Sequence, residues 1–404
     1  MNTTRPNKNE PAAIVVGGGL VGASAALGLA RAGLRVALVD MATAPVWNAD
    51  AAPDLRVYAI SPASSDLLEK LGVWGSIAAA RAQPYRMMRV WDAAAPNDEV
   101  RFSADDVALP WLGHIVEQNL IAAELARGLQ ACPNVVQHRP ARVVELTQDE
   151  DSVAVELDDG SHLKAKLLIA AEGANSPLRE KLGIGTSGRD YASRGVVGFV
   201  RTGKPHGDTC WQRFQPGGPL ALLPFTENRC SFVWTLPDAE AQRVLELDDA
   251  TFAREFERAS GGCLGAIEPL SPRAAFPLKL RLAKRYAQGR VVLAGDAAHG
   301  VHPLAGQGVN LGLADVAELV RLAEAAHAQR RDIGSPQLLR RYAARRRSED
   351  TLAAYTFDGI ERLFGTDAVL PTLLRGPALG LVDRLPPLKR FFVRHATGRR
   401  SATA

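Results

Sequence analysis

The hydrophobic pattern opens with two short apolar runs on either side of an alanine-rich stretch. Residues 12–16 form a run of small and β-branched residues, 17–22 are rich in glycine, and 23–32 are rich in alanine. Residues 35–40 form a second β-branched run. Short buried runs around a helical stretch predict strand, turn, helix and strand in that order. The start of the chain is therefore predicted to form a βαβ unit.

Further along, the pattern predicts that the chain returns to a sheet. Residues 64–71 place leucines on one helical face, and residues 153–157 and 167–171 have the pattern of strands with a turn at 158–160 between them. A final buried strand is expected near 290–294, followed by a helix from about residue 310 to 326.

Between these parts, from about residue 185 to 277, aromatic residues, prolines and glycines alternate with short apolar runs. This pattern is typical of an antiparallel sheet. A chain of 404 residues also exceeds the size at which a single core stops growing, so two domains are expected. We predict an α/β fold, in which a Rossmann-like domain carries an inserted antiparallel-sheet domain and a helical C-terminal region.

The predicted boundaries follow from these changes of pattern. The Rossmann-like domain takes residues 1–184 and 278–330, the inserted sheet takes 185–277 with a contribution near 85–112, and the helical region takes 331–404.

Composition and charge narrow the class of protein. Hydrophobic residues make up 47% of the chain and charged residues 23%, which is typical of a folded globular protein. The net charge is +4, and no nucleic-acid-binding motif accompanies the basic residues, so we exclude nucleic acid as a partner. Four isolated cysteines suit a reducing compartment and give no zinc pattern. With no apolar run of roughly 20 residues, the chain is expected in the cytoplasm, with at most surface attachment to a membrane.

The glycine-rich segment carries the first functional motif. Gly17, Gly19 and Gly22 are spaced GxGxxG between the first strand and helix. Missing side chains let the backbone approach a pyrophosphate, which the helix N-terminus then binds through free N–H groups. Asp40 ends the next strand, 18 residues after Gly22, where a carboxylate can accept hydrogen bonds from ribose hydroxyls. The motif predicts dinucleotide binding and fits NAD and FAD equally well.

The second motif follows the strand near residue 291. It runs from Gly295 and Asp296 to the string HPLAGQGVNLGLAD at 302–315. Asp296 at a strand end can hold a ribose or ribityl hydroxyl, and the glycines from Gly306 let backbone amides approach a ring or phosphate. This string resembles the signature of the ubiquinone-biosynthesis aromatic hydroxylases, which are single-component flavoprotein monooxygenases related to para-hydroxybenzoate hydroxylase. The resemblance covers nearly the whole chain, including RVYAIS at 56–61 and GPLALLP at 218–224.

The resemblance implies a set of cofactor-binding residues. Gly17, Gly19, Gly22 and Asp40 would bind the ADP half of FAD, Arg56 and Gln118 its middle, and Asp296 its ribityl or pyrophosphate region. The residues implied to border the isoalloxazine are Pro303, Gly306, Gln307, Gly308, Val309 and Asn310. The family's alanine-aspartate-glycine motif occurs here as Ala171, Glu172 and Gly173, so the contact with a pyridine nucleotide is expected to differ.

The chemistry implied by the resemblance belongs to the cofactor rather than to an activated side chain. FAD, reduced transiently by NAD(P)H, would react with O₂ and hydroxylate an aromatic ring through a flavin C4a-hydroperoxide. No catalytic side chain is assigned, because the sequence shows no Ser-His-Asp order and no P-loop lysine. His299 and His302 form a pair without a third ligand nearby in sequence, so we expect them to shape the loop and predict no metal site.

The substrate side of the site is predicted from the inserted sheet and the tail. Trp211, Phe214 and Phe225 are weak candidates for the ring pocket, since aromatic residues in strands more often pack in a core. Residues 380–392 mix apolar and basic side chains, which suits either a membrane surface holding a polyprenylated substrate or packing against the first domain. We therefore expect a prenylated aromatic substrate, O₂, a peripheral position at the inner membrane and membership of a ubiquinone-biosynthesis assembly.

Three alternatives remain open at this point. The first is a related flavin hydroxylase of a soluble aromatic. The second is a non-oxygenating subunit that binds FAD within a biosynthetic assembly. The third is an NAD-dependent dehydrogenase, which the string at 302–310 disfavours. The ring carbon, the choice of NADH or NADPH and the oligomeric state are not encoded in the motifs.

Overall fold

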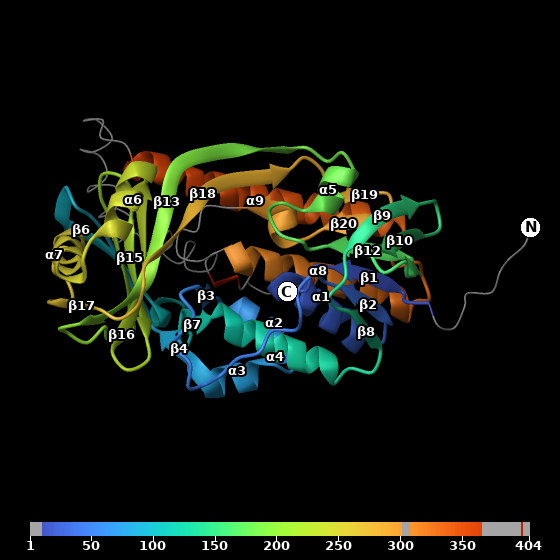
Figure 1. The fold of residues 1–404 in the computed structure, drawn as a ribbon, viewed down its shortest axis with the longest axis horizontal. Helices are drawn as coiled ribbons and strands as arrows, with labels where there is room; N and C mark the ends of the chain where they lie inside the picture. The colour runs from blue at the N-terminus through green and yellow to red at the C-terminus, as the bar shows by residue number, and fades with distance from the viewer. Residues whose placement is uncertain (1–9, 301–307, 366–396, 399–404) are drawn as a thin grey trace, which may run out of the picture.

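The computed structural model describes residues 10–300, 308–365 and 397–398, and Figure 1 draws them as one elongated molecule with a sheet at each end. One end is a parallel sheet covered by helices, and the other is a large sheet that carries two helices on its outer side. Within the described ranges, no helix is both long enough and apolar enough to pass through a bilayer.

The parallel sheet has the strand order β19-β20-β12-β1-β2-β8. All neighbouring pairs are parallel except β19–β20. Its strands are β1 (Ala13–Val16), β2 (Val36–Val39), β8 (Val135–His138), β12 (Leu167–Ala170), β19 (Ala287–Gln288) and β20 (Val291–Leu293). One face packs against α1 (Leu20–Arg31), α4 (Gln118–Gln130) and α8 (Gly308–Ala328). The predicted βαβ unit is thus present as β1, α1 and β2.

The alternation of side chains along β1 explains why this sheet is covered on both faces. Ala13 and Val15 belong to the core shared with the helices, whereas Ile14 and Val16 belong to a second core. That second core includes a three-stranded antiparallel sheet made of β9 (Val143–Gln148), β10 (Val153–Leu157) and β11 (His162–Ala165). A parallel sheet buried on both faces is read as a continuous apolar run, which is the pattern of residues 12–16.

The structure corrects one expected connection. The turn at 158–160 was expected to lie between strands at 153–157 and 167–171. Instead, the turn joins β10 to the additional strand β11, and β12 belongs to the parallel sheet between β1 and β20. The reason is that β11 is short and mixed in polarity, with His162 and Lys164 exposed, so it has no continuous apolar run.

The large sheet has the order β21-β18-β13-β16-β15-β14-β5-β6, with β17 paired to β13. Its strands are β5 (Met87–Asp92), β6 (Ala95–Ser103), β13 (Thr186–Thr202), β14 (Thr209–Phe214), β15 (Leu220–Phe225), β16 (Arg229–Pro237), β17 (Ile267–Pro269), β18 (Ala274–Ala283) and β21 (His299–Gly300). Every neighbouring pair is antiparallel except β14–β5. The sheet therefore takes in strands on both sides of residues 185–277. The α/β fold class with an added antiparallel sheet is confirmed.

A small sheet and several helices join the two ends. The small sheet has the order β3-β7-β4, formed by β3 (Val57–Ile60), β4 (Ala82–Tyr85) and β7 (Gly113–Glu117). Its apolar side chains share a core with the inner face of the large sheet. The remaining helices are α2 (Pro62–Lys70), α3 (Trp74–Arg81), α5 (Pro177–Lys181), α6 (Asp238–Glu246), α7 (Asp249–Ala259), α9 (Pro336–Gly365) and the short 3-10 turns η1 (Ala104–Val107) and η2 (Gly295–Ala297).

Candidate functional site

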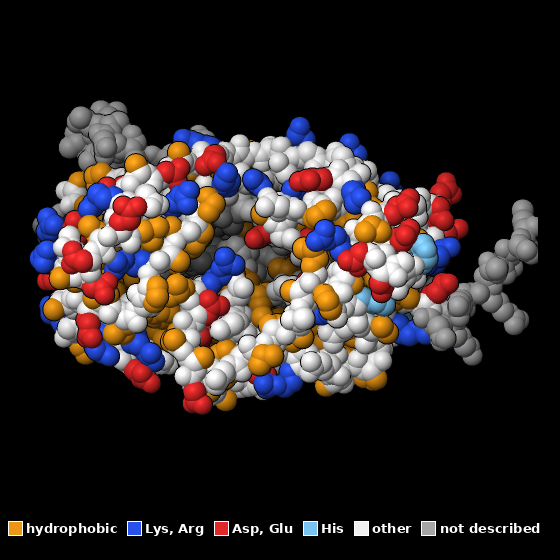
Figure 2. Space-filling model, in the orientation of Figure 1, with side chains coloured by type: hydrophobic (Ala, Val, Ile, Leu, Met, Phe, Trp, Pro, Cys, Tyr) orange, Lys and Arg blue, Asp and Glu red, His pale blue; other side chains and the backbone are white. Residues whose placement is uncertain are grey.

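The candidate site lies at the carboxyl edge of the parallel sheet. Because β1, β2, β8, β12 and β20 run in the same direction, the residues that follow them all meet at this edge. Those residues are Gly17, Asp40, Arg139, Ala171 with Glu172, and Gly295 with Asp296. Ligands bind in this position in open α/β sheets. Figure 2 shows the molecule hollowed between its two ends on this face.

The three motif glycines are needed for two different reasons. Gly17 has a φ of 100°, and a Cβ on it would lie 2.4 Å from the carbonyl oxygen of Ala171. A Cβ on Gly22 would lie 1.8 Å from the carbonyl oxygen of Gly17. A Cβ on Gly19, by contrast, would meet no atom within 4 Å. Gly17 and Gly22 are therefore required by the protein's own packing, whereas Gly19 leaves room for a ligand.

Asp40 and Arg139 flank the glycine turn. The Asp40 carboxylate accepts hydrogen bonds from the backbone N–H groups of Gly18 and, at 2.7 Å, Ala42. Arg139 Nη2 donates to the Gly18 carbonyl oxygen at 3.0 Å, while its Nε and Nη1 are buried with no hydrogen-bond partner in the described part of the chain. Burial lowers the pKa of Arg139, and nearby Asp40 opposes that shift. An acid and an unsatisfied guanidinium beside a glycine turn fit the adenosine and pyrophosphate parts of FAD.

The structure brings Arg56 and Gln118 together, as the resemblance implies for two residues of one site. Arg56 Nη1 donates to Gln118 Oε1 at 3.2 Å, and the hydroxyl of Tyr58 donates to the same oxygen at 2.8 Å. Burial raises the pKa of Tyr58 to about 12, so its hydroxyl remains a donor at neutral pH. Sequence reasoning missed Tyr58, although it lies in β3 only two residues after Arg56.

Asp296 lies in η2, directly after β20. Its side chain is accessible to solvent, although protein surrounds it. The surrounding protein partly desolvates the carboxyl and raises its pKa, while the charges of His299 and Arg56 oppose this rise. Arg179, which is 5% exposed, holds this turn from α5 by donating to the Ala297 carbonyl oxygen at 3.1 Å. The charge of Arg56 therefore acts on Asp296, so these two residues, which the resemblance assigns to neighbouring parts of the cofactor, lie near one another.

Asn310 is placed in the interior rather than on an open surface. Its Oδ1 accepts from the Ser61 backbone N–H at 3.0 Å and the Ser64 hydroxyl at 2.7 Å, and its Nδ2 donates to the Ala59 carbonyl oxygen at 2.8 Å. These contacts tie the start of α8 to β3 and α2. Gly308 and Val309 begin α8. Pro303, Gly306 and Gln307, like His302, lie outside the described residues.

Glu172 makes local contacts that account for its extra methylene. Its Oε2 accepts from the Ser176 hydroxyl at 2.6 Å and from the Leu178 backbone N–H at 3.2 Å. Burial raises its pKa, and these two hydrogen bonds oppose the rise. The longer side chain thus reaches the first turn of α5 and stabilises its N-terminus.

The three aromatic residues suggested for the ring pocket do not converge. Phe225 is fully buried and packs edge-on against Phe199, 5.0 Å between ring centroids, in the core shared with the small sheet. Phe214 is also buried and packs with Val90. Trp211 lies on the outer face with α6 and α7, where the Arg89 guanidinium stacks 4.3 Å from its ring centroid.

The glycine motif alone fits NAD and FAD equally well, and comparison with known proteins decides between them. The family described as FAD binding domain matches residues 10–353. The 3-demethoxyubiquinol 3-hydroxylase of Escherichia coli is 36% identical over 96% of this chain and 99% of its own length. The ubiquinone hydroxylase UbiL of Rhodospirillum rubrum is 37% identical over 95% of this chain and 89% of its own length.

Solved structures agree on the fold. The crystal structure of p-nitrophenol 4-monooxygenase from Pseudomonas putida superposes with a TM-score of 0.77 at 21% identity and covers 97% of this chain and 99% of its own. The family match spans both parts of the parallel sheet and the whole of the large sheet. The chain therefore belongs to the FAD-binding family of aromatic hydroxylases that includes the ubiquinone-biosynthesis hydroxylases.

Proposed function

We propose that this protein is an FAD-dependent monooxygenase that uses NAD(P)H and O₂ to hydroxylate the aromatic ring of a polyprenylated phenol in ubiquinone biosynthesis. The observation that carries the proposal is the meeting of the glycine turn, Asp40 and Asp296 at one edge of the parallel sheet. Arg56, which is paired with Gln118, lies close enough to Asp296 for its charge to lower the pKa of that carboxyl. Similarity to two ubiquinone hydroxylases over at least 95% of the chain supports the substrate class.

The residues at this edge divide the work of holding FAD. The N-terminus of α1 and the open side of Gly19 would receive the pyrophosphate, and Asp40 would accept hydrogen bonds from the adenosine ribose. Gln118 accepts from Arg56 and Tyr58, and it would hold the Arg56 guanidinium for contact with the middle of the cofactor. Asp296 would bind the ribityl or pyrophosphate region. When bound, FAD supplies the activation of O₂ and the transfer of one oxygen atom.

The rest of the protein positions the ring and excludes water. The inner face of the large sheet and the small sheet share an apolar core that includes Phe199, Leu223 and Phe225. This core holds the large sheet against the small sheet. A water-poor site between the two ends of the molecule would protect reactive intermediates from hydrolysis. We assign no nucleophilic side chain to the reaction, since the oxygen transfer belongs to the cofactor.

The place of the protein in the cell follows from the proposed substrate. A polyprenyl chain partitions into the bilayer, so an enzyme acting on its ring must reach the membrane surface. We propose a peripheral position at the cytoplasmic side of the inner membrane and contact with other enzymes of ubiquinone biosynthesis. The basic and apolar segment at 380–392, suggested for this contact, lies outside the described residues.

The experiment that tests the proposed function is deletion of the gene in its host, with the extracted quinones and prenylated intermediates analysed by mass spectrometry. Complementation uses wild type and Asp296→Ala. We expect an under-hydroxylated prenylphenol to accumulate, and only wild type to remove it. An unchanged quinone profile in a host without a redundant hydroxylase would exclude this function and favour a soluble aromatic substrate or a non-oxygenating role.

A further inference from the structure

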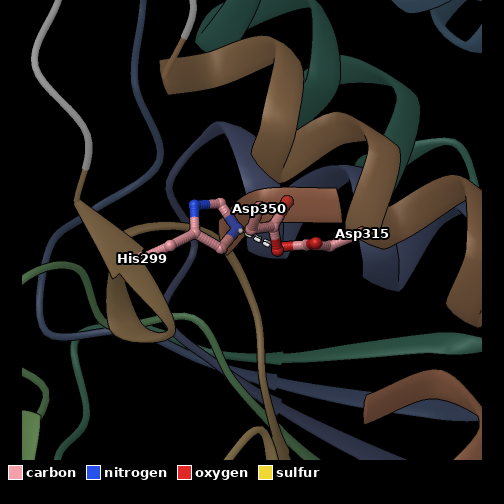
Figure 3. A group of neighbouring side chains, drawn as sticks. All are labelled: His299, Asp315 and Asp350. Atoms are coloured by element: carbon pink, nitrogen blue, oxygen red, sulfur yellow. Dashed lines mark hydrogen bonds and ion pairs between the residues drawn. The ribbon is translucent and has the colours of Figure 1, made fainter. Parts of the chain in front are cut away.

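A buried group of four charged side chains lies directly behind the turn that carries Asp296. The group consists of His299 from β21, Asp315 from α8, and Arg346 and Asp350 from α9, and we call it the Asp315 cluster. Its side chains are at most 3% exposed. Figure 3 shows His299 and the two carboxylates pointing toward one another from these separate elements.

Asp315 is the residue that connects the cluster to the cofactor edge. Its Oδ2 accepts from the Gly295 backbone N–H at 2.9 Å and from His299 Nε2 at 2.6 Å. One carboxylate oxygen of Asp315 thus binds both Gly295 and His299, which lie on either side of Asp296 in the sequence. The other oxygen, Oδ1, accepts from Arg346 Nε at 2.6 Å. The turn is fixed at both of its ends by a single side chain that does not itself face the edge of the sheet.

The charges explain why the cluster is stable without solvent. Arg346 bonds to both carboxylates, Asp315 and Asp350. Burial lowers the pKa of His299, but the two carboxylates outweigh burial and raise it to about 9. Burial opposes ionisation of Asp315, but the charges of His299 and Arg346 outweigh burial and lower its pKa. Burial and the charge of Asp315 raise the pKa of Asp350 to about 7, so near neutral pH the two cations face one full and one partial negative charge. Buried charges are tolerated when they are paired in this way. One His and two Asp could also ligate a metal. The guanidinium of Arg346, however, already serves as the cation between the two carboxylates.

We propose that Asp315 is a positioning residue for FAD binding, which fixes the 295–299 turn so that Asp296 faces the ribityl chain, with α9 contributing through Arg346. The geometry makes the last described helix part of the cofactor site, although α9 contributes no residue to the edge of the sheet. This inference rests on the role proposed above for Asp296, and it does not depend on which substrate is hydroxylated.

The first test compares two carboxylate-to-amide substitutions on the same helix. Asp315→Asn keeps the shape of the side chain but cannot accept from all three donors. Glu318→Gln is the matched control, because Glu318 lies one turn further along α8 and pairs only with Arg321 and Arg345 among the described residues. The apo-proteins are titrated with FAD at pH 7.5. We expect the Kd for FAD to rise at least tenfold for Asp315→Asn and less than twofold for Glu318→Gln.

The dependence of the Kd for FAD on pH distinguishes a positioning role of the Asp315 cluster from a purely structural role. Besides Asp315, the groups that face His299 are Asp350, Arg346, Asp296 and the stacked ring of Tyr286, 6.1 Å away. Because the pKa of His299 is raised, its favourable charge is present at neutral pH and lost as the pH rises through about 9. We expect the Kd for FAD of wild type to rise at least threefold between pH 7.5 and 10.

His299→Gln supplies the control for this profile. A glutamine amide can still donate to Asp315 but carries no titrating charge, so this variant should show a smaller rise than wild type over the same range. Any titration of FAD itself affects both proteins equally and cancels in the comparison.

The outcomes distinguish this inference from the proposed function. If Asp315→Asn melts at a lower temperature than wild type but binds FAD with unchanged Kd, or if wild type and His299→Gln show the same pH profile, Asp315 has only a structural role and the inference is wrong. If Asp315→Asn does not fold, the His299→Gln profile alone decides. Absence of hydroxylation by an FAD-loaded wild-type protein would contradict the proposed function and leave these binding results intact.

Discussion

Replacing two glycines of the same motif by alanine should have different effects. Gly22→Ala should destabilise the apo-protein, and Gly19→Ala should weaken the binding of FAD. In Gly22→Ala the new Cβ would lie 1.8 Å from the Gly17 carbonyl oxygen, so the backbone must move. Overpacking against rigid backbone costs about 3 kcal/mol or more, and better helix propensity returns about 1 kcal/mol. We expect the apo-protein to lose at least about 2 kcal/mol of unfolding free energy, equivalent to roughly 2 °C in Tm for a chain of 404 residues.

Gly19→Ala should leave the apo-protein almost unchanged. Its Cβ meets no atom within 4 Å, and its φ of −68° is allowed for alanine. The poorer N-cap and the stiffer unfolded chain offset each other to within about 1 kcal/mol. The added methyl group, however, enters the space proposed for the pyrophosphate. Overpacking there of about 2 kcal/mol corresponds to a rise of about 30-fold in the Kd for FAD.

Both effects are measured on the same protein samples, by urea denaturation of the apo-protein and by titration with FAD. Gly22→Ala should change the stability of the apo-protein, and Gly19→Ala should change the affinity for FAD. This prediction would be refuted if Gly19→Ala bound FAD as tightly as wild type, or if apo Gly22→Ala unfolded at the wild-type urea concentration.

Three further predictions use other parts of the structure. Asp40→Asn cannot accept from both the Gly18 and Ala42 N–H groups and a ribose hydroxyl, so we expect the Kd for FAD to rise by about tenfold. Flavin fluorescence titration measures the Kd, and an unchanged Kd would show that Asp40 does not bind FAD. Burial lowers the pKa of His114 to about 4, so the protein should lose about 3 kcal/mol of stability as the pH falls from 6.5 toward 4. Urea denaturation at each pH should show a smaller loss for His114→Gln, and equal losses would contradict the assignment. Arg290→Ala removes the ion pair with the partly exposed Asp332 and the hydrogen bonds to the carbonyl oxygens of Glu150 and Lys166, which leaves those carbonyls unsatisfied. It should cost about 3 kcal/mol, with unchanged FAD affinity in the same titration.

Much of the cofactor edge could be predicted from sequence because local chemistry determines it. A glycine turn between β1 and α1, and an acid at the end of β2, depend only on neighbouring residues. The apolar runs of β1, β2 and β12 are continuous because both faces of the parallel sheet are buried.

The parts that sequence reasoning missed depend on contacts between distant segments. Arg139 reaches the glycine turn only because β8 pairs with β2, and β8 itself is too mixed in polarity to be recognised as a strand. The partners of His299 were missed because they too are distant in sequence. No third ligand lies near it in sequence, but Asp315 and Asp350 reach it from two different helices. Long-range pairing of this kind has no periodic signal in the chain.

Hydroxylation of a prenylated phenol with oxygen from O₂ can be measured directly. The assay contains the purified, FAD-loaded protein, a short-chain prenylated phenol, NAD(P)H and ¹⁸O₂. The product is analysed by mass spectrometry. We expect a hydroxylated ring that carries one ¹⁸O atom and is formed only when reductant, FAD and O₂ are all present. Its yield should be strongly reduced for Asp296→Ala. A product whose new oxygen comes from water, or NAD(P)H consumption with no hydroxylated phenol, would contradict the proposed function.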